Sequence, residues 1–210
     1  MLAAFVPVMV GSAVAFNEEK LNIIFSLAAL ICSVLIQVGT NFTNDLYDYL
    51  NGADTVKRKG PRRVLASGLI SVNEMKSAII ITFLTAFLLG LYLVYHGGIV
   101  ILIIGVLSIL AGLAYTAGPY PLAYNALGDV FVFMFFGIVG TVGTYFLHTK
   151  ELSLISFISS IPVGALVTNI LVVNNYRDAD EDKLTGKKTL AVKFGKNFSR
   201  YQFIFLIIIS

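Results

Sequence analysis

This sequence has few charged residues, a single cysteine and no tryptophan. Charged side chains make up 13% of its 210 residues, whereas soluble domains carry roughly 25%. The composition therefore argues against a globular fold in water. The single cysteine, Cys32, excludes an internal disulfide and any metal site built from several cysteines. Without tryptophan, tyrosine and phenylalanine must form any aromatic belt at a membrane surface.

The sequence contains several long stretches without a charged residue. A bilayer core about 30 Å thick is crossed by about 20 helical residues. The uncharged stretch 77–128 is long enough for two such helices, with a natural break at His96-Gly97-Gly98. We therefore predict an all-α fold, a polytopic membrane helical bundle with about seven spans. The expected spans are residues 1–16, 21–46, 77–95, 99–117, 127–147, 152–176 and 201–210.

The apolar stretches reach both ends of the sequence. The first begins at Met1, and the last ends at Ser210 without a polar flank. We therefore expect residues 1–210 to form a single membrane domain that is truncated at both ends. A cleaved signal peptide is the alternative for residues 1–16, although no positively charged segment precedes that stretch.

The basic residues predict the orientation of the bundle in the membrane. Thirteen of the fifteen lysines and arginines lie in two connections, residues 47–76 and 177–200. Because four expected spans separate these connections, both face one compartment, which the positive-inside rule identifies as the cytoplasm. We expect a multi-pass protein of the cell membrane with both loops cytoplasmic. The net charge of +3 is explained by contact with the lipid bilayer and needs no nucleic acid partner.

Two acidic clusters follow the second and the sixth expected spans. Asp45 and Asp48 are three residues apart, and Asp178 and Asp182 are four apart, so each pair shares one face of a helix. We expect two such pairs on one membrane side to converge on a shared divalent cation. Ligands that are all oxygen favour Mg²⁺. The alternative interpretation is that these carboxylates are ordinary solvated residues just past helix ends.

The surroundings of the two clusters share a layout. In each, asparagine precedes an aspartate pair, which is followed by glycine and then by lysine. This similarity predicts an internal four-helix repeat, with residues 1–120 and 121–210 as its halves. Asp180 and Glu181, inside the second cluster, are expected to be solvated.

Two stretches carry a resemblance to a known family. NFTNDLYDYLNGADT, residues 41–55, and NNYRDADEDKLTGKKTLAVKFG, residues 174–195, resemble the two aspartate-rich signatures of the UbiA superfamily of intramembrane aromatic prenyltransferases. GPYPLAYNALGDVFVFMFFG, residues 118–137, and RKGPRRVLASGLI, residues 58–70, are similar to its menaquinone branch. The resemblance implies about nine helices around a central cavity open to lipid. It also implies Mg²⁺-dependent transfer of a polyprenyl chain from polyprenyl diphosphate to 1,4-dihydroxy-2-naphthoate, giving demethylmenaquinone.

The resemblance also implies a role for individual residues. Asp45 and Asp48 would hold one Mg²⁺, and Asp178 and Asp182 the other. Tyr115 would lie at the cavity mouth and stabilise the allylic cation through its ring face. The residues implied to bind the diphosphate, or water on the metal, are Asn41, Asn44, Lys57, Arg58, Arg62, Arg63, Asn175 and Lys187. The family often carries a third acid where this sequence has Gly52, and the next carboxylate here is Asp54. Asp54 is therefore expected near the substrate, and its role is left open.

Several alternatives remain at this point. Phe131, Phe135 and Phe136 would exclude water if they lined the cavity, but the pattern favours helix packing for them. The acceptor is 1,4-dihydroxy-2-naphthoate by resemblance, with 4-hydroxybenzoate as an alternative. A membrane enzyme like the CDP-alcohol phosphotransferases would concentrate its acids in one signature, and here they are divided between two helices. A cation transporter would place carboxylates near the middle of the membrane, and here they lie at helix ends beside basic residues.

Overall fold

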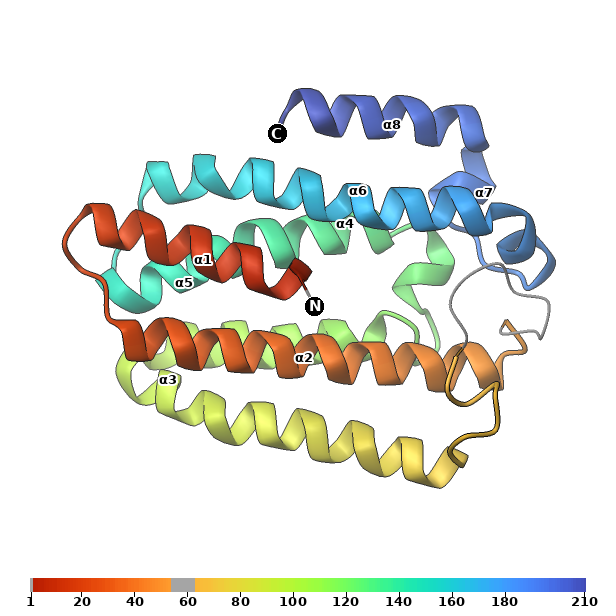
Figure 1. Cartoon of the computed structure of the whole chain (residues 1–210), viewed down its shortest axis with the longest axis horizontal. Coiled ribbons are helices and arrows are strands. Elements are labelled where there is room, and N and C mark those ends of the chain that lie inside the picture. The colour runs from red at the N-terminus through yellow and green to blue at the C-terminus, as the bar shows by residue number, and fades with distance from the viewer. Residues whose placement is uncertain (1, 54–62) are drawn as a thin grey trace.

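The computed structural model describes residues 2–53 and 63–210, and the regular structure in these ranges is entirely helical (Figure 1). The fold is a bundle of long helices that run nearly side by side. The elements are α1 (Leu2–Asn17), α2 (Ile23–Leu50), α3 (Val72–Ala114), η1 (Leu122–Asn125), α4 (Gly128–Val132), η2 (Phe133–Val139), α5 (Gly140–Thr149), α6 (Leu154–Leu184), α7 (Leu190–Phe194) and α8 (Lys196–Ile208). The predicted fold class is confirmed.

Local sequence signals account for where the long helices begin. The side-chain oxygen of Asn22 accepts a hydrogen bond from the backbone N–H of Ile24 at 2.9 Å, which caps α2. Ser71 and Glu74 form a reciprocal capping box at the start of α3, in which the Ser71 N–H donates to Glu74 at 2.7 Å. Such caps satisfy the backbone donors that the first helical turn leaves unpaired.

The helix α3 is a hairpin of two arms. At about 1.5 Å per residue, its 43 residues would extend about 65 Å as a straight helix, twice the thickness of a bilayer core. Gly98 interrupts it with φ 69° and ψ −160°, a conformation essentially restricted to glycine. Figure 1 shows the two arms folded back on each other, both beside α2. The predicted break between residues 95 and 99 is therefore confirmed.

The segment from Gly128 to Thr149 is one apolar helix with an irregular middle. Its central part, η2, is a π-helix of seven residues, a feature that in proteins often marks a functional site. A Cβ atom on Gly137 of η2 would lie 2.7 Å from the Cα of Gly164 on α6. The two glycines therefore allow the backbones of η2 and α6 to approach closely.

Four helical segments in the described part of the chain are long and apolar enough to cross a membrane. They are Ile23–Leu50, Val72–Ala114, Gly128–Thr149 and Leu154–Leu184, and Ala3–Asn17 is a shorter apolar helix. The prediction of a multi-pass membrane protein agrees with these helices. Two statements stay predictions: that the chain has about seven spans, and that residues 1–120 and 121–210 are the halves of an internal repeat.

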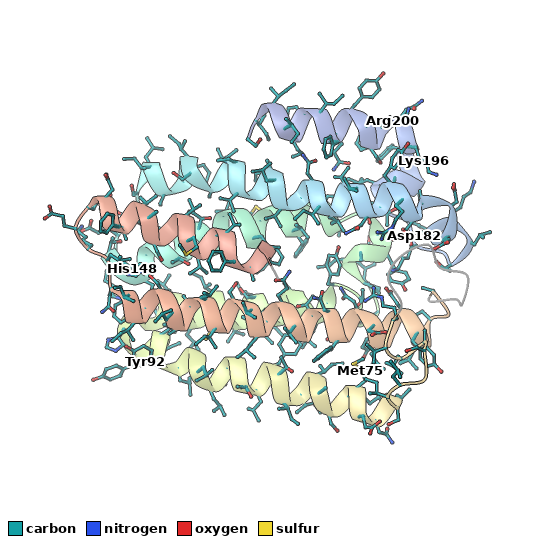
Figure 2. The ribbon with its side chains drawn as sticks, in the orientation of Figure 1. Met75, Tyr92, His148, Asp182, Lys196 and Arg200 are labelled. Atoms are coloured by element: carbon teal, nitrogen blue, oxygen red, sulfur yellow. The ribbon has the colours of Figure 1, made fainter. Side chains whose placement is uncertain are left out.

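One end of the bundle is fastened by polar contacts between its turns. The Asn22 N–H donates to Nδ1 of His148 at 3.1 Å, and Lys20 pairs with Glu151 at 3.1 Å. These contacts join the α1–α2 turn to the α5–α6 turn. Figure 2 shows His148 at the end of the bundle opposite Asp182. The acidic clusters therefore lie at the other end.

Candidate active site at the acidic end of the bundle

The first acidic pair is buried within the last turns of α2. The exposed fraction is 6% for Asp45 and 2% for Asp48. Carboxylates are almost never this buried unless they are paired with other groups or bind a ligand. The interpretation of Asp45 and Asp48 as ordinary solvated residues is therefore wrong.

Asp48 joins three separate segments of the chain. Its Oδ1 accepts a hydrogen bond from the hydroxyl of Tyr124 in η1 at 2.8 Å. Its Oδ2 accepts one from Nζ of Lys187, in the loop after α6, at 2.9 Å. Arg63 approaches the same oxygen at 3.5 Å. The structure thus brings the predicted residues Asp48, Arg63 and Lys187 together from positions far apart in the sequence.

Asp45 has one oxygen in use and one without a partner. Its Oδ2 accepts a hydrogen bond from the backbone N–H of Val64 at 3.2 Å, which ties the start of the next segment to α2. Its Oδ1 is buried and has no hydrogen-bond partner among the residues that the structure describes. A buried carboxylate oxygen left unpaired is costly, so Oδ1 is an available ligand atom for a cation.

The second acidic pair lies on the last two turns of α6. Asp178 is 9% exposed, and Arg177 donates to both of its oxygens, at 2.6 and 2.7 Å. Asp182 is half-buried and lies on the last turn of α6, at the end of the bundle opposite His148 (Figure 2). Asp180 is exposed and pairs with Lys196 at 2.7 Å, as expected for a solvated residue.

Tyr115, which directly follows α3, has acids from three helices within electrostatic range. They are Asp48 of α2, Asp129 of α4 and Asp182 of α6. A Cβ atom on Gly128 would lie 3.0 Å from the Tyr115 hydroxyl, so the glycine leaves room for the phenol. One member of each acidic pair therefore lies in the electrostatic neighbourhood of this phenol.

The three predicted asparagines differ in their surroundings. The Asn44 side-chain oxygen accepts a hydrogen bond from the Thr116 hydroxyl at 2.8 Å, which holds it next to Tyr115. Asn175 is half-buried on α6, one turn before Asp178, and Asn41 is exposed one turn before Asn44. The structure therefore fixes Asn44 most firmly at the site.

An apolar cavity opens from Tyr115 into the bundle. Its volume is about 220 Å³, and its wall comes from α1, α2, both arms of α3 and the segment from α4 to α5. Phe131, Phe135 and Phe136 are part of this wall, so the prediction that they serve helix packing rather than the cavity was wrong. Phe131 belongs to α4 and the other two belong to η2, and the apolar sequence of this segment gives no sign of which side faces the cavity.

Four predicted substrate-binding residues, Asp54, Lys57, Arg58 and Arg62, lie outside the described residues. Their roles stay predictions.

The ligand atoms for a metal are present as pairs rather than as one ready-made cluster. Within residues 2–53 and 63–210, no three histidine, cysteine or acidic side chains are gathered closely enough to hold a metal ion. Mg²⁺ usually takes one or two protein carboxylates and completes its shell with water and phosphate oxygens. A buried pair with a free Oδ1 on Asp45 fits that requirement.

Sequence reasoning missed two residues of the site. Tyr124 was not singled out, because residues 118–137 were used only for their resemblance to the menaquinone branch. Thr116 was not identified as the partner of Asn44. A signal existed for Tyr124, since a tyrosine one turn before Gly128-Asp129 is placed to reach a neighbouring helix end.

Comparisons with known proteins identify the family of the chain. Residues 4–210 match the sequence profile of the UbiA prenyltransferase family. The chain is 34% identical over 206 residues to the 1,4-dihydroxy-2-naphthoate octaprenyltransferase of Haemophilus influenzae, covering 91% of the chain and 65% of that relative. It is 37% identical over 205 residues to the enzyme of the same description from Escherichia coli, covering 94% and 67%. The chain thus spans about two thirds of the length of these relatives.

A solved structure of digeranylgeranylglyceryl phosphate synthase is similar in fold. The TM-score is 0.64 at 21% identity, over 99% of this chain and 70% of that one. At this level of identity, the likeness supports the helical architecture alone.

Proposed function

Because this chain belongs to the UbiA prenyltransferase family, we propose that it transfers a polyprenyl chain from a polyprenyl diphosphate to 1,4-dihydroxy-2-naphthoate. The acceptor is proposed from the relatives, which are described as octaprenyltransferases for that compound. Membership of this family sets aside the CDP-alcohol phosphotransferase and cation transporter alternatives. The observation that carries the proposal is the meeting of Asp48 with Lys187 at 2.9 Å in a bundle that also encloses an apolar cavity.

The polar end of the site is suited to the diphosphate. Lys187 and Arg63 are cationic groups from two different segments that approach the same carboxylate oxygen. Fixed cations of this kind neutralise a leaving diphosphate without a proton transfer. The side chain of Lys187 is only 14% exposed, so its charge is weakly screened by water. Lys187 and Arg63 together provide two positive charges at this end of the site.

We propose that Asp45 and Asp48 hold one Mg²⁺ and that Asp178 and Asp182 hold a second. Bound Mg²⁺ supplies charge neutralisation to the diphosphate as the allylic carbon–oxygen bond breaks. The protein positions these ligands by burying Asp45 and Asp48 in α2 and by bracing Asp178 with Arg177. The unpaired Oδ1 of Asp45 is the atom best prepared for the first ion.

The apolar end of the site is suited to the allylic cation and the acceptor. An allylic cation reacts with water unless water is excluded. The aromatic rings of Phe131, Phe135 and Phe136 line the cavity next to Tyr115. Ring faces attract a cation within about 6 Å, so this wall both excludes water and favours the positive carbon. The acceptor ring would enter from the same cavity and attack that carbon.

The membrane placement follows from the same arrangement. The polyprenyl chain and the product are soluble in lipid, while the diphosphate needs a polar rim. We propose a location in the cell membrane with both aspartate-rich loops on the cytoplasmic side, as the distribution of basic residues indicates.

Conversion in isolated membranes tests the proposal. Membranes containing the protein are expected to join 1,4-dihydroxy-2-naphthoate to polyprenyl diphosphate with Mg²⁺ present, and to stop when a chelator removes the metal. Asp45→Ala and Asp178→Ala should each abolish product. Asp180→Ala is the matched control, because Asp180 is exposed and pairs with Lys196. Unchanged turnover in Asp45→Ala and Asp178→Ala would reject the metal assignment. Product formed only with 4-hydroxybenzoate or homogentisate would reject the acceptor.

A further inference from the structure

Tyr124 lies where the three segments of the site meet. It belongs to the 3₁₀ turn η1, in the connection between the second arm of α3 and α4. This turn is held from several sides. The Ala123 N–H donates to the Tyr115 carbonyl at 2.9 Å, and the Asn125 amide donates to the Pro121 carbonyl at 2.8 Å. The position of the Tyr124 side chain is therefore set by a braced turn rather than by a loose loop.

Tyr124 contacts both an acid and a base of the site. Its hydroxyl donates to Oδ1 of Asp48 at 2.8 Å, and Nζ of Lys187 lies 5.0 Å from the centre of its ring. The Lys187 Nζ in turn reaches Oδ2 of Asp48 at 2.9 Å. Phenol, carboxylate and ammonium thus form a closed triangle of contacts.

The backbone of Tyr124 adds a further link to the same loop. Its carbonyl accepts a hydrogen bond from the Lys188 N–H at 3.0 Å. The residue next to Lys187 is therefore fixed to η1 through the main chain, while Lys187 itself rests against the ring. The loop after α6 is held against η1 at two consecutive positions.

We propose that Tyr124 is a positioning residue that sets Asp48 and Lys187 in register for a metal-bound diphosphate. This role rests on the proposed function and deepens it. A metal-bound diphosphate needs a carboxylate on the metal and a cation on the phosphate oxygens at a fixed separation. The Tyr124 hydroxyl directs one Asp48 oxygen, and the ring supports the Lys187 ammonium. Groups that orient metal ligands typically contribute about 10- to 100-fold in metal affinity.

The test is Tyr124→Phe in the full chain, with Mn²⁺ and inorganic pyrophosphate as the probes. Electron paramagnetic resonance counts free Mn²⁺ and gives binding without any need for turnover. Phenylalanine keeps the ring beneath Lys187 and removes only the hydroxyl on Asp48. We expect the dissociation constant for Mn²⁺ with pyrophosphate to rise about 10- to 100-fold. The KM for the aromatic acceptor should not change.

Tyr120→Phe is the matched control. Tyr120 lies four residues earlier on the same connection and is 62% exposed, so its loss of a hydroxyl should leave Mn²⁺ binding unchanged. The thermal midpoint, measured at Cys32 with a thiol-reactive dye, should equal that of the parent for Tyr120→Phe. It should fall by about 2–4 °C for each 1 kcal/mol lost in Tyr124→Phe, because that variant removes a hydrogen bond from a buried carboxylate. Binding is therefore compared well below both midpoints, and a loss of Mn²⁺ binding that disappears at such temperatures would show a merely structural role and overturn the proposal.

Two results separate this proposal from the proposed function. Parent-like Mn²⁺ binding by Tyr124→Phe would overturn the role of Tyr124 and leave the prenyltransferase assignment intact. A parent protein that binds no Mn²⁺ with pyrophosphate would overturn the proposed function and the role of Tyr124 with it.

Discussion

The close crossing of η2 and α6 makes Gly137→Ala a test of the whole wall of the cavity. An added Cβ atom would lie 2.7 Å from the Cα of Gly164 and 3.0 Å from the carbonyl oxygen of Ser160. Both atoms belong to the backbone, so no side chain can turn aside to make room. The methyl group therefore forces the two helices apart or distorts η2.

The magnitude follows from the cost of overpacking a close helix crossing. Extra methyl groups in tightly packed regions cost about 1–3 kcal/mol of unfolding free energy. For a chain of 150–250 residues, each 1 kcal/mol lowers the thermal midpoint by about 2–4 °C. We therefore expect the midpoint of Gly137→Ala to fall by roughly 2–12 °C. Prenyl transfer should fall as well, because Phe135 and Phe136 of η2 line the cavity.

The single cysteine provides the assay. Cys32 is 8% exposed, so a thiol-reactive fluorogenic dye reports its exposure as the protein unfolds in detergent. Gly90→Ala on α3 is the control, because an added Cβ atom there would meet nothing within 4 Å. Alanine in place of a helical glycine stabilises by up to about 1 kcal/mol, so the control midpoint should stay or rise. A Gly137→Ala variant as stable as the parent would refute the packing argument.

Two further predictions concern the α3 hairpin and the diphosphate end of the site. Gly98→Ala should lower the free energy of unfolding by about 1–3 kcal/mol, seen as a lower thermal midpoint at Cys32, because φ 69° with ψ −160° strains any other residue. Gly105→Ala is the control, since an added Cβ atom there meets nothing within 4 Å and should not lower the midpoint. Equal midpoints in the two variants would contradict the prediction. Lys187→Met should raise the KM for polyprenyl diphosphate about 10- to 100-fold, since a hydrogen bond to a charged group contributes about 1.5–3 kcal/mol. Lys183→Met, at an exposed position, is its control, and equal KM values in the two variants would show that Lys187 does not bind the diphosphate.

Much of the fold could be predicted because lipid imposes simple requirements on a sequence. Uncharged runs of sufficient length must become helices, since the bilayer core offers the backbone no other hydrogen-bond partners. This requirement located α2, α6 and the apolar segment that begins at Gly128. The two adjacent glycines at positions 97 and 98 also located the hairpin in α3, because only glycine adopts the required φ and ψ.

The candidate site could be predicted only in part. Asp48, Arg63 and Lys187 were identified because charged side chains are conspicuous beside membrane helices. Tyr124 and Thr116 were missed, since a hydroxyl in a connection gives no sign of its partner. The cavity role of Phe131, Phe135 and Phe136 was misjudged, because composition does not show which side of an apolar helix faces the cavity.

The sequence alone determined that this chain is a membrane helical bundle and that its two aspartate pairs lie at the end of the bundle carrying the basic loops. Each of those features follows from the residues of a single helix or loop. Only the tertiary structure decided that Asp48 is shared by Tyr124, Arg63 and Lys187, and that Phe131, Phe135 and Phe136 line an apolar cavity. Contacts of this kind depend on how helices cross and on which way each backbone turns, and those are properties of the packed bundle.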